Sequence, residues 1–167
     1  MKKKNVYYLC NAGVIAALYV VLTLFISAFN LASGAIQVRI SEALTILPYF
    51  TPAAIPGLFI GCLLSNYITG AAIWDVVFGS LATLIGAFGT YLLRKHKFLA
   101  PIPPIVANTI IVPFVLIYAY GLTDAYWFLA LTVGAGEVLS CGVLGLILLF
   151  ALEKHKKSIF RNNDFEN

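Results

Sequence analysis

The chain has 167 residues, a mean hydropathy of +0.94 and only 11% charged residues. A soluble globular domain of this size carries far more charge, so we predict an integral membrane protein. Much of the positive charge lies in three basic clusters at predicted helix ends, at 2–4, 94–97 and 154–157, so the net charge of +4 gives no support for nucleic-acid binding.

Six apolar segments predict an all-α bundle of six transmembrane helices that forms one domain over 1–167. In chain order the helices cover about 7–29, 36–50, 53–69, 74–93, 101–120 and 126–152, and 153–167 form a cytoplasmic tail. The first segment fits the ~20 residues that cross a bilayer. It is too long for the core of a secretory signal.

Small residues at a spacing of four mark one face of the first helix. Ala12 and Ala16 would let another helix approach closely. The spacing alone leaves two interpretations open, which are packing within this protein and docking against a different subunit.

The stretch 36–69 is apolar but contains Pro48, Pro52 and Pro56. Each proline removes a backbone donor and clashes with the preceding turn, so the stretch cannot be one straight helix. We predict two short helices with a break at 50–53.

The basic clusters test this break, because cytoplasmic loops are enriched in Lys and Arg. If 36–69 crosses the membrane twice, all three clusters lie on one side. We therefore predict six crossings with both termini in the cytoplasm.

Several polar residues fall towards the outer face in this topology. They are the candidate substrate-binding residues Arg39, Glu42, Asn66, Trp74 and Asp75. Alternatives stay open for each kind of side chain. Arg39 and Glu42 could simply pair on one helix face. Asp75 could only favour a helix N-terminus, and Trp74 could be an interfacial aromatic residue.

Glu137 lies about eleven residues into the last helix, ~16 Å deep. A carboxylate at this depth is a candidate for the binding site by default, and a structural ion pair is the alternative. Acids outnumber bases in this half of the bundle, which favours a ligand with several N–H donors or a positive charge.

Motifs of enzymes are absent from the sequence. There is no G-x-x-x-x-G-K-[ST] phosphate loop, no H-E-x-x-H and no G-x-S-x-G, so we predict neither catalytic residues nor ATP hydrolysis by this chain. Cys10, Cys62 and Cys141 have no C-x-x-C spacing, so we predict no metal site, no disulfide and no cofactor.

Three motifs resemble the QueT family of bacterial membrane proteins. They are RISEALTILPYFTPAAIPGLFIGCLLSN at 39–66, DVVFGSLATLIGA at 75–87 and PPIVAN at 103–108. Proteins of this family are substrate-binding S components of energy-coupling factor (ECF) transporters assigned to the uptake of queuosine precursors.

The resemblance implies partners and a ligand. An S component docks on one transmembrane T component and two ATPases, and Ala12 and Ala16 match the small-residue motif that contacts the T component. The implied ligand is a 7-deazaguanine base such as preQ0 or preQ1. An S component for another vitamin or heterocycle, and a membrane scaffold without transport activity, are the alternatives.

Overall fold

The computed structural model describes residues 2–28 and 39–155, with side chains from Asn5 onwards. Every element in these ranges is helical, which confirms the all-α class. The helices in chain order are α1 (Lys2–Ala28), η1 (Ile40–Tyr49), α2 (Ala54–Ile68), α3 (Ile73–Leu92), α4 (Ile102–Tyr120), α5 (Tyr126–Glu137), η2 (Val138–Leu144) and α6 (Gly145–Glu153).

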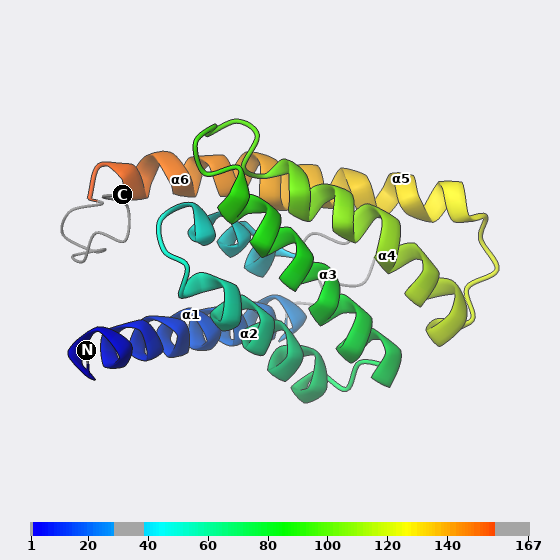
Figure 1. The fold of residues 1–167 in the computed structure, drawn as a ribbon. Coiled ribbons are helices and arrows are strands. Elements are labelled where there is room, and N and C mark those ends of the chain that lie inside the picture. Colours follow the sequence, from blue (N-terminus) through cyan, green and yellow to red (C-terminus); the bar gives the residue numbers. More distant parts are fainter. Residues whose placement is uncertain (1, 29–38, 156–167) are drawn as a thin grey trace.

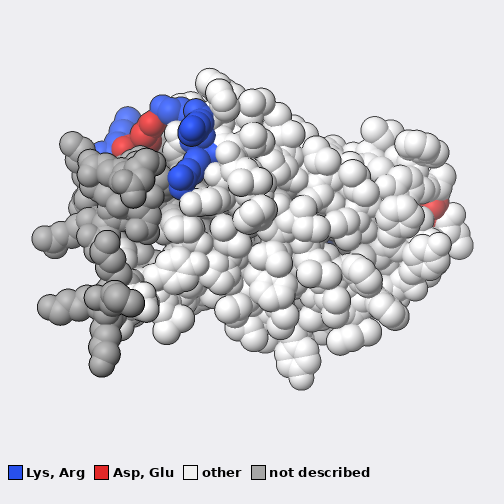
Figure 2. Space-filling model, in the orientation of Figure 1, with Lys and Arg blue, Asp and Glu red and all other residues white. Residues whose placement is uncertain are grey.

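Four helical stretches are long and apolar enough to cross a membrane, namely Asn5–Ala28, Ile73–Leu92, Ile102–Tyr120 and Tyr126–Glu153. The start of α1 and the end of α6 lie at the same end of the bundle (Figure 1). Lys and Arg side chains gather at this end, which we call the basic end (Figure 2). The six crossings and the cytoplasmic termini stay predictions.

The break at 50–53 is confirmed. η1 ends at Tyr49, α2 begins at Ala54, and the chain reverses its direction between them (Figure 1). At rises of ~2.0 Å and ~1.5 Å per residue, η1 and α2 are about 20 Å and 22 Å long, which is shorter than the ~30 Å hydrocarbon core.

The first of the two short helices differs from the prediction, because η1 is a 3₁₀ helix that contains Pro48. Pro48 cannot donate a backbone hydrogen bond. The Thr45 hydroxyl donates to the Glu42 carbonyl oxygen at 2.6 Å, which adds a bond over three residues. Residues 36–38, where this helix was predicted to begin, lie outside the described ranges.

η1 lies at the centre of the bundle, in contact with α1, α2, α3, α6 and η2. Eight of its ten residues are buried. Its apolar side chains Ile46 and Leu47 join α1 and α2 in the largest hydrophobic core. The central element of the fold therefore also carries Glu42, which is only 1% exposed.

α1 and α2 pack closely through small residues. A Cβ added at Gly57 would lie 2.7 Å from the carbonyl oxygen of Ala12, and one at Gly61 would lie 3.0 Å from that of Ala16. Ala12 and Ala16 are buried in this contact. Of the two interpretations that the spacing left open, packing within the protein is the one that the structure uses.

The last predicted helix is not α-helical over its whole length. It runs as α5, then as a π-helix in η2, then as α6. π-Helical turns occur frequently at functional sites. Here the π-helix begins directly after Glu137 and carries Ser140 and Cys141, both buried.

Candidate functional site

A polar pocket of about 490 Å³ lies at the end of the bundle opposite the basic end. The last turns of α1, α2 and α4 and the first turns of η1 and α3 surround it. Three of the predicted site residues line it, namely Arg39, Asn66 and Asp75, together with Tyr120. We call it the outer pocket.

Asp75 is the most connected residue of the outer pocket. Its Oδ2 accepts a hydrogen bond from the Tyr120 hydroxyl at 3.0 Å and lies 3.8 Å from Nη2 of Arg39. The Tyr120 hydroxyl accepts one from the Ala72 N–H at 3.2 Å. Arg39 is thus paired with Asp75 on another helix, and not with Glu42 on its own helix, which was the simple alternative.

Asn66 lies beside Asp75 over the backbone of Gly79. Its Nδ2 donates to the Asp75 carbonyl oxygen at 3.4 Å. A Cβ at Gly79 would lie 3.0 Å from Asp75 Oδ1 and 3.2 Å from Asn66 Nδ2. Because Gly79 has no side chain, Asp75 Oδ1 and Asn66 Nδ2 can approach its backbone closely.

The other two predicted carboxylates lie together in the interior, in a group that we call the inner cluster. Glu42 accepts a hydrogen bond from the Tyr19 hydroxyl, and Glu137 accepts one from the Cys141 thiol at 3.1 Å. Asn108, which is 3% exposed, lies close to both carboxyl groups. Glu42 Oε2 has no hydrogen-bond partner among the described residues.

Cys141 joins the two halves of the inner cluster, since its sulfur also lies 3.4 Å from the Glu42 carbonyl oxygen. One ligand atom from each of Glu42, Glu137 and Cys141 lies within 4.8 Å of the others, a spacing that a metal ion could bridge. The hydrogen bonds of the thiol and of Tyr19 already explain this arrangement, so the geometry does not require an ion.

Hydropathy alone could not reveal the roles of Tyr19 and Cys141. Both lie inside long apolar runs, where aromatic and thiol side chains are ordinary core residues. The useful signal is that a buried tyrosine hydroxyl in an apolar helix needs a hydrogen-bond partner. Sequence reasoning also missed Tyr120 as a site residue, because it lies 45 residues along the chain from Asp75, to which its hydroxyl donates.

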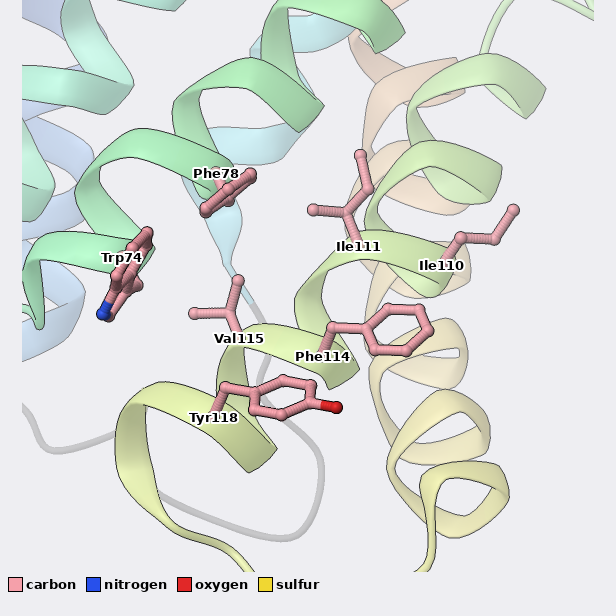
Figure 3. Close-up of a pocket in the computed structure, with 7 residues that line it drawn as sticks. All are labelled: Trp74, Phe78, Ile110, Ile111, Phe114, Val115 and Tyr118. Atoms are coloured by element: carbon pink, nitrogen blue, oxygen red, sulfur yellow. The ribbon is translucent and has the colours of Figure 1, made fainter.

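Trp74 lies apart from the other predicted site residues. It lines an apolar groove of about 680 Å³ between α3 and α4, with Phe114 and Tyr118 (Figure 3). Its ring stacks on Phe78 at 5.9 Å, and the residue is 57% exposed. These features fit the interfacial alternative better than a position in the outer pocket.

The predicted residues Ala12 and Ala16 are buried in α1, whereas the neighbouring small residues Gly13 and Ala17 are exposed. A Cβ at Gly13 would meet no described atom within 4 Å.

The comparisons with known proteins agree with the resemblance. The QueT transporter family matches residues 9–154. "Queuosine precursor transporter QueT" from Lactococcus lactis subsp. cremoris (strain MG1363) is 36% identical over 98 residues, which are 58% of this chain and 57% of that relative. The chain thus matches just over half the length of the curated relative.

No solved structure matches the chain. The family match covers most of the 167 residues and includes all the residues of the inner cluster and of the outer pocket named above. With its long apolar helices, the protein is a multi-pass membrane protein. It belongs to the QueT transporter family.

Proposed function

We propose that this chain is the substrate-binding S component of an ATP-driven ECF importer, and that it captures a queuosine precursor of the 7-deazaguanine type from outside the cell. Membership of the QueT family supports the transport role. The name of the Lactococcus lactis relative supports the class of solute.

One observation carries the proposal for this structure. Ionisable and amide side chains form an outer pocket and an inner cluster inside a bundle whose other buried side chains are mostly apolar. Charged residues inside a membrane are costly and mark substrate pathways. The outer pocket lies opposite the basic end, and the positive-inside rule supports the proposal that it opens on the outer side of the membrane.

The chemistry of these groups suits a purine-like base. A carboxylate can accept two parallel hydrogen bonds from neighbouring N–H groups of a guanine-like edge. Glu42 and Glu137 would accept them, and Asn66 would pair with another part of the ring edge. Arg39 would orient Asp75, which would receive further donors.

The energy for transport would come from partner subunits, because the chain has no phosphate-binding loop. A T component and two ATPases are the proposed partners. We place the docking face at Gly13 and Ala17, because Ala12 and Ala16 are covered by α2.

Binding of preQ0 and preQ1 to purified protein in detergent tests the proposal. We expect a saturable signal in isothermal titration calorimetry with at least one of the two bases. Glu137→Gln should weaken it by about tenfold or more, since a hydrogen bond to a charged acceptor is lost in an apolar site. Asp124→Asn is the matched control, because Asp124 is exposed in the loop before α5.

A folded wild-type protein that binds neither base would contradict the proposed substrate class. A thermal-shift screen of other vitamins and heterocycles would then separate the two alternatives. Binding of another such ligand would indicate an S component for a different solute, and no ligand at all would favour the membrane scaffold.

A further inference from the structure

Only one of the two carboxylate oxygens of Asp75 accepts a hydrogen bond from the described residues. Oδ2 accepts from Tyr120 and faces Arg39, whereas Oδ1 is buried and has no hydrogen-bond partner among the described residues. The residue as a whole is 5% exposed and lines the outer pocket. A buried acceptor without a partner has lost its hydrogen bonds to water and forms none within the protein, which costs free energy. Because Asp75 lines the pocket, a hydrogen-bond donor of a bound ligand would satisfy this atom.

The charges of the outer pocket and the inner cluster, taken together, are not balanced by described residues. Between residues 5 and 93 and between 98 and 152, the acids other than the exposed Asp124 are Glu42, Asp75 and Glu137, and Arg39 is the one cation. All three acids are at most 5% exposed. Buried charges in proteins are usually paired, so this region favours a ligand that brings a positive charge.

The contact of Arg39 with Asp75 involves the other oxygen of this carboxylate. Its guanidinium lies on the Oδ2 side of Asp75, at the long distance of 3.8 Å. Oδ1 lies beside Gly79, where an added Cβ would be 3.0 Å from Oδ1 and 3.2 Å from Asn66 Nδ2. A cation that donates to Oδ1 would share the carboxylate with Arg39 without replacing it, and the burial of Asp75 away from water would strengthen the attraction.

We propose that the outer pocket selects ligands that carry a protonated amine, which donates to Asp75 Oδ1, over neutral ligands of the same shape. This inference rests on the proposed function and narrows its substrate class. The pocket volume of about 490 Å³ falls within the range of small-molecule sites. Among the two candidate bases, preQ1 carries an aminomethyl group that is protonated at neutral pH. The nitrile of preQ0 has no proton to donate.

Isothermal titration calorimetry of the full-length protein with preQ1 and with preQ0 provides the test. We expect preQ1 to bind wild-type protein at least about tenfold more tightly, as one charge-assisted hydrogen bond implies. Asp75→Asn should remove this preference by weakening the binding of preQ1 about tenfold more than it weakens the binding of preQ0. Asp124→Asn, which makes the same change on the exposed loop, should leave both affinities unchanged.

The wild-type comparison does not depend on how well the variant folds. If preQ0 binds wild-type protein as tightly as preQ1 does, or if Asp75→Asn weakens both ligands equally, the selection of a cation is refuted while the proposed function stands. If neither base binds the folded wild-type protein, the proposed function itself fails, and this inference fails with it.

Discussion

The contact between α1 and α2 yields a prediction that depends only on backbone and Cβ atoms. Replacing Gly57 by alanine would place a Cβ 2.7 Å from the carbonyl oxygen of Ala12 and 3.1 Å from the Cβ of Ile15. Cβ and carbonyl atoms cannot rotate away, so the two helices must separate. The small size of Gly57 is therefore what sets the distance between α1 and α2.

The size of the effect follows from two opposing terms. Overpacking of a tight contact costs about 1–3 kcal/mol. Alanine recovers up to about 1 kcal/mol of helix propensity relative to glycine. The free energy of unfolding should thus fall by up to about 2 kcal/mol. At about 2–4 °C per kcal/mol for a chain of this length, the melting temperature should fall by up to about 8 °C.

Thermal unfolding of the purified protein in one detergent measures this change. Gly13→Ala is the matched control, since Gly13 lies in the neighbouring helix α1 and an added Cβ there meets no described atom within 4 Å. It should leave the melting temperature unchanged or raise it slightly. Equal melting temperatures for Gly57→Ala and Gly13→Ala would refute the close approach of α1 to α2.

Three further changes test the site and its surroundings. Gly61→Ala would place a Cβ 2.8 Å from the Cβ of Tyr19 and so displace this residue. We expect calorimetry to show a lower ligand affinity and thermal unfolding to show a lower stability. A loss of stability alone would mean that Tyr19 does not support the site. Tyr19→Phe removes the hydroxyl that donates to Glu42, which should lower the stability by about 1–3 kcal/mol because a buried acceptor loses its partner; an unchanged melting temperature would speak against this bond. Gly13→Leu should abolish copurification with a T component and its ATPases while the free subunit stays folded. The control Val14→Leu should copurify normally. Normal copurification of Gly13→Leu would exclude docking on this face.

The prolines of the central stretch show how much of the fold local sequence can predict. Three prolines within nine residues forbid a single straight helix wherever the stretch lies in space. Together with the distribution of Lys and Arg, they predicted the break at 50–53 that separates η1 from α2. Neither constraint distinguishes an α-helix from a 3₁₀ helix, because the winding of η1 also depends on contacts with five neighbouring elements.

The candidate site was predicted as a set of residue types, not as a set of pairs. Hydropathy identifies Glu42, Asp75 and Glu137, since any charge in an apolar run stands out. It cannot say that Arg39 pairs with Asp75, or that Trp74 lies in a separate groove.

The sequence by itself determined the class of the protein, the places where the chain turns and the residues that are too polar for lipid, because these depend on composition and on neighbours within a few positions. The tertiary structure alone decided which face of α1 is covered, and which hydroxyls and thiols reach the carboxylates. The physical reason is that a rotation of a helix by one residue turns its side chains by about 100°. Packing against distant segments, which no local pattern records, sets that rotation.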